Sequence, residues 1–479
     1  MNKVSVNTMK QSHRWIGFVV LMLTIFVLVY PMSLNWVWDE GSWGHHGQYE
    51  KMAEAILDGH LYMDYEVDPK LLALDNPYDR VAREAAGVHY EFDHAFYAGH
   101  YYMYFGVAPV FLLFVPAKLL GITLASSEGT QVFAAIAVAG FFALFDVLRR
   151  KYAKELSFAG YLAFSAATSF VSLWYAVKYP ALYCTAIVSG IALAVWGLYF
   201  AVKENAFLAA LCGALVFGCR PTIGFVSILY LPLIWQFVRN KWSDLNKAKK
   251  WRSVLGFCLP YVIVAALLMT YNYARFHNPF EFGQSYQLTL VDQHQYMGES
   301  FTFGKEFWMR LWADIKFYFV AWTPLGERFP YIHEDGFLYL FPIVLLGLVA
   351  FVPKIKTRKG EQIDDESSCN QMPCTQIRGF ALSILITVLA IMLLQTKWSP
   401  NVLRRYAMDF GFLLMILAFL GICRMLELAK GKVVKWMNAL VIGLSVLACL
   451  VCVLLFFATG ESAMADMHPE LIDKIEFWR

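Results

Sequence analysis

Charged residues are scarce in this chain of 479 residues. They make up 16% of the sequence, against about 25% in an average soluble domain. Hydrophobic residues make up 59%, and the mean hydropathy is positive. This balance excludes an ordinary water-soluble protein and predicts a chain that folds in a bilayer.

Signatures of several enzyme classes are absent too. The sequence contains no P-loop, no Gly-x-Ser-x-Gly nucleophile elbow and no dinucleotide-binding glycine fingerprint, so neither nucleotide-driven chemistry nor a nucleic-acid partner is expected. The nine cysteines are scattered, and seven lie in or beside apolar blocks, which gives no indication of a disulfide framework. No internal repeat is apparent, which weakens an interpretation as a repeat-built transporter.

The apolar residues form blocks of about 18 or more, the length that crosses a hydrocarbon core. They predict an all-α polytopic membrane protein, a single domain over residues 1–479 with about eleven (eleven to thirteen) transmembrane helices. The first block has no small-residue cleavage site after it and is expected to stay as a helix. The predicted spans are residues 15–34, 130–148, 156–176, 180–202, 206–219, 222–238, 253–273, 336–353, 378–396, 403–427 and 436–458.

Basic residues indicate the orientation of these spans. When the spans are joined in order, one side of the membrane, that of the N-terminus, collects Arg149 to Lys151, Lys203, Arg239 to Arg252, Lys354 to Lys359 and Lys430 to Lys435. Cytoplasmic loops are enriched in Lys and Arg. The N-terminus is therefore expected in the cytoplasm.

One segment leaves a second topology open. Residues 101–121 are apolar and long enough to cross the membrane, but they contain Pro109 and Pro116. If this segment crosses, every later loop inverts and the run from Arg149 to Lys151 lies outside, against the usual bias. A juxtamembrane or re-entrant helix is therefore preferred.

Two long loops are predicted on the extracytoplasmic side, residues 35–129 and 275–335. Residues 35–100 of the first hold thirteen Asp and Glu against four Lys and Arg, and loops of this length are usually functional. Helical spacing of apolar residues from Tyr49 to Leu57, before Gly59, predicts an amphipathic helix lying on the membrane.

The second loop is expected to hold another amphipathic helix. Its apolar face is predicted to comprise Trp308, Leu311, Trp312, Ile315 and Trp322, while Arg310 and Asp314 turn to water.

Candidate site residues gather where these loops meet the predicted spans. Asp39 and Glu40 follow the first span directly, where a carboxylate beside lipid gains basicity by desolvation; the alternative is that both are solvated loop residues. Extracytoplasmic cations form a second group, in which a lipid phosphate would pair with guanidinium groups, although each cation alone could be a snorkelling anchor. This group comprises Arg220, Lys397, Arg404 and Arg405, the last two followed by Tyr406 and by the intramembrane Asp409.

Aromatic and imidazole side chains gather in the third group. Asp93 and His94 precede a run that includes Tyr101 and Tyr104; an interfacial aromatic belt would explain the tyrosines equally well. The first loop also holds six histidines, but no tight ligand motif such as His-Glu-x-x-His appears, so no metal site is assigned, although a divalent metal is not excluded.

These features resemble the membrane-embedded glycosyltransferases of the GT-C superfamily, which includes protein O-mannosyltransferases and the lipid A aminoarabinose transferase. The resemblance covers most of the chain. It rests on the acidic pair Asp39-Glu40 at the end of the first span and on the large loop with juxtamembrane helices that follows. Stretches that look like bacterial members of this class are Asp93-His94 with Tyr101 to Pro109, Gly218 to Thr222, and Tyr271 to Gly283.

The resemblance implies a GT-C-like bundle in a bacterial plasma membrane, with its active site on the extracytoplasmic side. It implies a polyprenyl-phosphate-linked sugar as donor, an extracytoplasmic glycan, lipid or protein as acceptor, membrane lipids as surroundings and no cofactor. Asp39 would be the general base in an inverting displacement. Glu40, Asp93, His94, Tyr101 and Tyr104 would shape the acceptor site, and the donor phosphate would meet Arg220, Lys397, Arg404, Arg405 and Tyr406.

One departure from the family pattern concerns the first loop. The best-known relatives often carry a Lys-Pro-Pro type motif at its end, where this chain has His94 and His100-Tyr101. The identities of donor and acceptor are therefore left open. The competing interpretations are a transporter or flippase for a lipid-linked sugar, which would need polar residues along a full transmembrane path, and a glycan polymerase or ligase.

Overall fold

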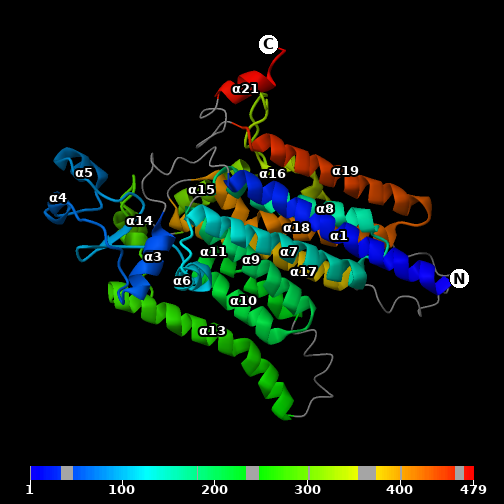
Figure 1. Ribbon diagram of the computed structural model, residues 1–479, viewed down its shortest axis with the longest axis horizontal. Helices are drawn as coiled ribbons and strands as arrows, with labels where there is room; N and C mark the ends of the chain where they lie inside the picture. Colours follow the sequence, from blue (N-terminus) through cyan, green and yellow to red (C-terminus); the bar gives the residue numbers. More distant parts are fainter. Residues whose placement is uncertain are drawn as a thin grey trace.

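A computed structural model describes residues 2–33, 47–180, 182–233, 247–299, 303–353, 374–399, 402–458 and 469–478 of the chain. Within these ranges the protein is largely helical, and its two strands form one short hairpin (Figure 1). Eight helical stretches are long and apolar enough to cross a membrane, which confirms a polytopic membrane protein: His13–Ser33, Ser126–Tyr152, Phe158–Lys178, Leu182–Val202, Val254–Phe276, Gln376–Trp398, Arg404–Leu428 and Lys432–Leu455.

Three further predicted spans form shorter apolar helices, so the predicted count of eleven is not confirmed. They correspond to Ala206–Cys219, Pro221–Leu233 and Pro342–Phe351. The described parts of these helices are shorter than a spanning α-helix of about 20 residues. The chain directly after Leu233 lies outside the described residues.

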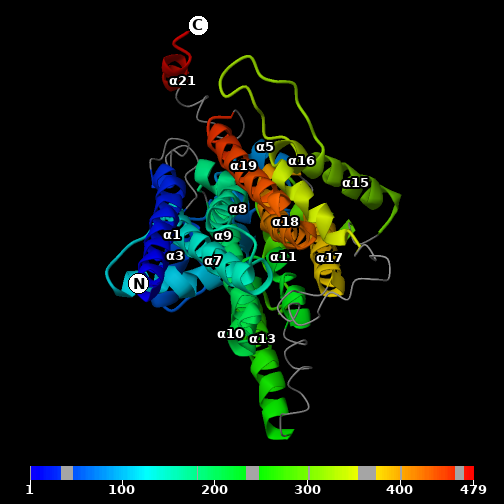
Figure 2. The ribbon, with the colours of Figure 1, turned by 90° about the vertical axis from the view of Figure 1, so that its right-hand side faces the viewer.

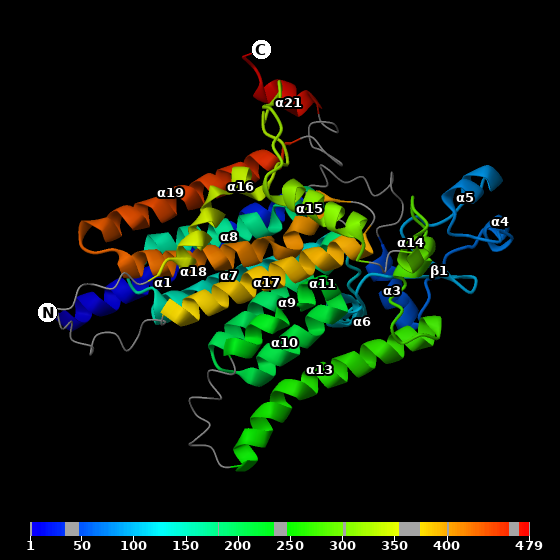
Figure 3. The same ribbon diagram turned by 180° about the vertical axis from the view of Figure 1, so that it is seen from behind.

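The helices lie along one common direction (Figures 1 and 3). In chain order they are α1 (Asn2–Ser33), α7 (Ser126–Tyr152), α8 (Phe158–Lys178), α9 (Leu182–Val202), α10 (Ala206–Cys219), α11 (Pro221–Gly224), α13 (Lys247–Phe276), α16 (Phe337–Leu340), η3 (Pro342–Phe351), α17 (Cys374–Trp398), η5 (Arg404–Ala407), α18 (Met408–Leu428) and α19 (Lys432–Leu455). The central helix is α18, because 94% of its most apolar 18-residue stretch is buried.

Close backbone contact holds the centre of the bundle. A Cβ atom added at Gly421 of α18 would lie 1.8 Å from the carbonyl oxygen of Leu346 in η3, so only glycine fits at this crossing. At the periphery lies α13, in which only 6% of the most apolar 18-residue stretch is buried. Figure 2 shows the first part of α13 leaving the bundle, and Pro260, which cannot donate a helical hydrogen bond, lies inside it.

The two ends of the bundle differ in character. One end, here called the loop end, carries the segments 47–107 and 277–299, and the N-terminus lies at the other end (Figure 1). The last turn of α7, with Arg149 to Lys151, and the turn that begins α19, with Lys430 and Lys432, share the end of the N-terminus.

The first long loop folds into short elements packed on the loop end. They are α3 (Gln48–Leu57), α4 (Pro69–Leu72), α5 (Arg80–Ala86), the hairpin β1 (Ala95–Tyr97) and β2 (His100–Tyr102), the π-helical η1 (Val110–Phe114) and α6 (Val115–Leu119). Asp68 and Asp79 cap α4 and α5 by accepting hydrogen bonds from backbone N–H groups. Residues 101–121 therefore combine a strand with a ten-residue helix, which is too short to cross.

The predicted helix after Tyr49 is present as α3, and it ends just before Gly59, whose φ is 91°. Most of its apolar face meets other parts of the protein, and Leu57 is exposed. The Tyr49 ring stacks on Phe114 of η1 at 5.3 Å, and Met52 and Ala53 are buried. Packing inside the first loop thus accounts for most of the amphipathic pattern of α3. The sequence pattern alone does not distinguish such packing from contact with a membrane surface.

The second long loop supplies η2 (Gln284–Tyr286), α14 (Gln293–Glu299) and α15 (Lys305–Phe319). Trp308 and Trp312 of the predicted apolar face of α15 are exposed. Asp314 differs from the prediction: it was expected to face water, but it is buried and accepts a hydrogen bond of 2.5 Å from the Thr396 hydroxyl of α17. The last element, α21 (Pro469–Ile475), lies beyond the bundle near the C-terminus (Figure 1).

Candidate functional site

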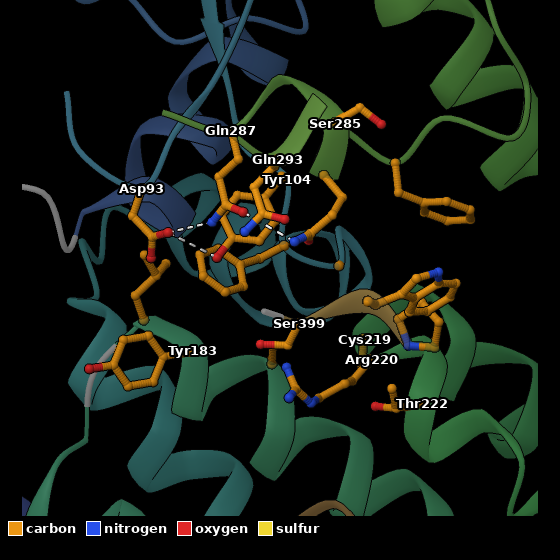
Figure 4. Close-up of a pocket in the computed structure, with 18 of the residues that line it drawn as sticks. Asp93, Tyr104, Tyr183, Cys219, Arg220, Thr222, Ser285, Gln287, Gln293 and Ser399 are labelled. Atoms are coloured by element: carbon orange, nitrogen blue, oxygen red, sulfur yellow. Dashed lines mark hydrogen bonds between the residues drawn. The ribbon is translucent and has the colours of Figure 1, made fainter. Parts of the chain in front are cut away.

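A cavity of about 670 Å³ opens at the loop end of the bundle. Its walls come from three regions that are distant in sequence: residues 92–107 of the first loop, the end of α13 with residues 280–293 after it, and the helix ends around residues 183, 220, 398 and 405. Figure 4 shows part of this lining, with Asp93, Gln287, Gln293 and Tyr104 on one side and Arg220 and Thr222 on the other.

A buried ion pair sets the position of Arg220. The residue lies between α10 and α11, and its Nε donates to both carboxylate oxygens of Asp409, at 2.7 and 2.8 Å. Asp409 is fully buried and also accepts hydrogen bonds from Thr222 and Gln395, at 2.8 and 2.9 Å. Burial of a carboxylate is tolerated when its oxygens are paired in this way.

A second cation, Arg405, also lines the cavity. Its guanidinium lies over the Tyr183 ring, 3.9 Å from the centroid, a cation–π contact. Arg220 and Arg405 each lie 5.5 Å from the ring of Tyr406, so both guanidinium groups lie near one aromatic ring. The Tyr406 hydroxyl in turn lies 3.3 Å from the Ser399 hydroxyl, which also lines the cavity.

The opposite side of the cavity presents the carboxylate of Asp93. This residue has a left-handed backbone, with φ of 61°, a conformation that costs energy for a residue other than glycine and is often found at functional sites. The Tyr104 hydroxyl donates to its Oδ1 at 3.2 Å, and the Gln287 amide donates to the same oxygen. Burial, and then the charge of Asp93, raise the pKa of Tyr104 well above its ordinary value, so the hydroxyl stays protonated as a donor.

Backbone bonds hold Asp93 in this place. Its N–H donates to the Leu288 carbonyl at 2.9 Å, and its own carbonyl accepts from the Gln48 amide at 2.9 Å. Gln48, the first residue of α3, and Leu288, which follows η2, thus both hold the backbone of Asp93 in place. The two long loops are joined at the cavity wall.

Gly106 brings two walls of the cavity into contact. A Cβ atom at this position would lie 2.1 Å from the Cys219 carbonyl oxygen and 2.3 Å from that of Gly218. No side chain fits there, so the first loop rests directly on the end of α10. Arg220, the next residue after Cys219, is thereby kept close to the loop wall.

The third wall, after α13, is held by Arg275 and Glu281. Arg275 donates to the Met103 carbonyl at 2.6 Å and to the Asn272 side chain at 2.9 Å. Glu281 accepts from the N–H of Gly283 at 2.6 Å and from the Ser285 hydroxyl at 2.8 Å. Both charged groups therefore serve the local loop structure, although they line the cavity.

Five of the predicted site residues line this cavity together: Asp93, Tyr104, Arg220, Arg405 and Tyr406. Two others from the first loop lie behind its wall. His94 is buried, with its Nδ1 2.9 Å from the Phe92 carbonyl, and Tyr101 packs edge-on against it at 6.0 Å. Burial raises the pKa of Tyr101 to about 12; both residues support the hairpin.

Two of the predicted cations also lie away from the cavity lining. Arg404 lies 3.7 Å over the Phe317 ring and donates to the Phe317 carbonyl at 2.7 Å, so it anchors α15. Lys397 is buried at the end of α17, and its Nζ lies 5.5 Å from the Phe303 ring.

Asp39 and Glu40, the predicted base and its neighbour, lie outside the described residues. Gln48, the first residue of α3, donates to the backbone carbonyl of Asp93.

The prediction missed several polar groups of the cavity, among them Tyr183, Gln287, Gln293 and Gln395. Gln395 could have been found from the sequence, because an amide inside an apolar span is uncommon. Its partner Asp409 had already been named as an intramembrane carboxylate. Gln287 and Gln293 sit in a polar loop, where nothing in the sequence distinguishes them from their neighbours.

One cluster among the described residues has the spacing of a metal site, and it lies outside the cavity lining. Side-chain ligand atoms of Asp58, His60 and Asp64 lie within 4.8 Å of one another. Both aspartates are exposed, and His60 Nδ1 lies 2.9 Å from the Tyr62 carbonyl.

Comparisons of the chain with family profiles, curated proteins and solved structures found no match. The chemistry of the site therefore rests on its own geometry. The two guanidinium groups in the lining suit an anion such as a phosphate. The carboxylate of Asp93, with amide and hydroxyl groups around it, suits a hydroxyl-rich group.

Proposed function

We propose that the protein is a glycosyltransferase that moves a sugar from a polyprenyl-phosphate donor to an extracytoplasmic acceptor. The observation that carries the proposal is the cavity at the loop end, which combines Arg220 and Arg405 with Asp93 at the ends of membrane-spanning helices. A lipid-borne substrate would place its phosphate at this depth. The sugar would then extend toward the loop wall.

The two cations would stabilise the negative charge that develops on the phosphate in such a reaction. The donor is a phosphodiester with one negative charge, and bond cleavage leaves a phosphomonoester, whose second pKa near 6 gives it almost two charges at neutral pH. Positive groups that await the leaving phosphate lower the barrier because they act more strongly on the transition state than on the ground state. Arg220 and Arg405 fill this role in the proposal.

The reaction is a single inverting displacement. The acceptor hydroxyl forms a bond to the anomeric carbon, the bond from that carbon to the phosphate oxygen breaks, and a carboxylate takes the hydroxyl proton. Asp39 is the proposed general base, with Glu40 beside it. Asp93, held by Tyr104 and Gln287, orients sugar or acceptor hydroxyls.

The proposed orientation places the N-terminus in the cytoplasm and the cavity outside, in a bacterial plasma membrane. The basic turns around Arg149 and Lys430 lie at the end opposite the cavity, and such turns favour the cytoplasmic side. Single cysteines at Asp75 and Lys154 in a cysteine-free background test this in intact cells. Impermeant maleimide is expected to label position 75 only, and labelling of position 154 alone would invert the topology.

A transporter of the same substrate is supported less well. Transport across the membrane requires polar groups along the whole path. A smaller cavity toward the other end of the bundle, between α7, α9 and α18, is lined by aliphatic and aromatic residues such as Leu144, Leu198 and Phe419, with no charged group. Of these two cavities, only the one at the loop end is lined by charged groups.

The direct test uses purified protein in nanodiscs and polyprenyl-phosphate donors with a radiolabelled sugar. Wild-type protein is expected to release or transfer the sugar, and Asp39→Asn to lose at least about 100-fold, since general-base catalysis contributes 10²–10⁴. Asp75→Asn, an exposed acid in the same loop, is the matched control and retains activity. Transfer by Asp39→Asn at the wild-type rate would remove Asp39 as base, and the absence of transfer with every donor sugar would reject the function.

A further inference from the structure

Asp409 is a buried carboxylate that does not line the cavity. It lies in the first turn of α18, within a candidate membrane span, and its exposed fraction is 0%. Its partners do line the cavity: Arg220, Thr222 and Gln395 all contribute to the wall. Asp409 therefore ties together side chains from the α10–α11 junction and from α17, one layer beneath the ligand space.

The geometry of the ion pair leaves part of Arg220 unused. A guanidinium carries five N–H donors, one on Nε and four on the two terminal nitrogens. Nε alone contacts Asp409, and neither terminal nitrogen bonds any described residue. The Arg220 side chain is 16% exposed, so its terminal N–H groups are directed to the cavity (Figure 4).

We propose that Asp409 is a positioning residue that holds Arg220 by Nε, so that both terminal nitrogens face one phosphate group in the cavity. Two parallel N–H bonds to neighbouring oxygens are the arrangement in which guanidinium binds phosphate best. The inference rests on the proposed function for the identity of the anion. The geometry itself comes from the contacts of Asp409.

A second buried carboxylate provides a matched control. Asp314 is 5% exposed, and it accepts a hydrogen bond from Thr396, the residue after Gln395 in α17. Neither Asp314 nor Thr396 lines the cavity. Removal of this charge therefore tests what the loss of any buried carboxylate near the end of α17 does to the protein.

The experiment is a double-mutant cycle in phosphatidylcholine nanodiscs, with the dissociation constant of a polyprenyl monophosphate and the thermal unfolding temperature as readouts. The samples are wild type, Asp409→Asn, Arg220→Gln, the double variant and Asp314→Asn. Inorganic phosphate as competitor shows whether the headgroup alone is recognised.

Asp409→Asn is expected to weaken binding about 10- to 100-fold, the loss typical when a group that orients a binding side chain is removed. In the Arg220→Gln background the same change should cost less than about twofold, because Asp409 acts through Arg220. The double variant should regain thermal stability relative to Arg220→Gln, since no unpaired buried charge remains, without regaining affinity. A purely structural pair would recover both together. Asp314→Asn should bind within about twofold of wild type.

Wild-type affinity in folded Asp409→Asn, or an equal loss in both backgrounds, would overturn the proposal. If Asp409→Asn does not fold, Asp409→Glu keeps the charge but moves the carboxylate by one methylene. A several-fold loss of affinity then supports positioning, and unchanged affinity opposes it. Sugar transfer measured on the same samples separates the two proposals: coupling without any transfer rejects the glycosyltransferase and retains the role of Asp409, whereas transfer without coupling does the reverse.

Discussion

Gly106→Ala is expected to disable the cavity without unfolding the protein. The new Cβ would lie 2.1 Å from the Cys219 carbonyl oxygen and 2.3 Å from the Gly218 carbonyl oxygen. Cβ atoms essentially never approach another atom within 3.0 Å, so the two backbones must separate by about 0.9 Å. Both contacts are backbone atoms, so rotation of a side chain cannot relieve them.

The separation falls between the two halves of the proposed site. Gly106 follows the wall that holds Asp93 and Tyr104, and Cys219 precedes Arg220. A displacement of about 1 Å can lower the rate about 100-fold when reacting groups are no longer aligned. The overpacking itself is expected to cost about 1–3 kcal/mol of stability, which leaves most of the protein folded.

Sugar transfer in nanodiscs and thermal unfolding are the paired measurements for Gly106→Ala. Gly443→Ala in α19 is the matched control, because nothing lies within 4 Å of its Cβ position and alanine favours a helix by about 1 kcal/mol. It should keep wild-type transfer. If Gly106→Ala transfers sugar within twofold of wild type, the contact between the two walls does not set the geometry of the site.

Three further predictions concern stability. Gly421→Ala would place Cβ 1.8 Å from the Leu346 oxygen, so its unfolding temperature should fall well below that of Gly443→Ala; an unchanged value would contradict the close crossing of α18 and η3. Burial raises the pKa of the Asp314 carboxyl above its ordinary 3.8, so the contribution of Asp314 to stability should be greatest below pH 4 and decrease as pH rises through the raised pKa. Wild type should therefore lose stability relative to Asp314→Asn over this range; parallel pH profiles of the two proteins would refute the assignment. Glu476 accepts hydrogen bonds from the backbone N–H of Phe329 and from the side chains of Arg328 and Tyr331. Glu476→Ala removes these hydrogen bonds, each worth about 0.5–1.5 kcal/mol, and should speed proteolysis near the C-terminus, with equal cleavage rates as the contrary result.

Sequence alone identified the membrane-spanning helices well, because hydropathy is a local property and each span satisfies its own backbone hydrogen bonds. Eight of the predicted spans were found at nearly the predicted places. The same locality explains the failures on amphipathic segments. The face of α3 that looked suited to lipid is covered by η1 and α6, and Asp314 of α15 lies against α17 rather than in water.

The sequence predicted which types of residue form the candidate site. It did not predict which individual residues of those types line the cavity. Charges and aromatic residues near span ends marked Asp93, Arg220 and Arg405, because polar groups at a membrane boundary are costly and require a reason. The same criterion also selected Arg404 and Lys397, whose side chains meet Phe317 and Phe303 instead.

The sequence by itself determined that the protein folds in a bilayer. It also indicated at which ends of the helices the polar side chains of a site would lie. Only the tertiary structure decided which of those polar groups face one another. Asp93, Arg220, Gln287 and Arg405 meet in one cavity because helix crossings and loop contacts, such as that of Gly106 with Cys219, bring distant segments together. Such contacts depend on packing between elements, which no periodicity within a single element encodes.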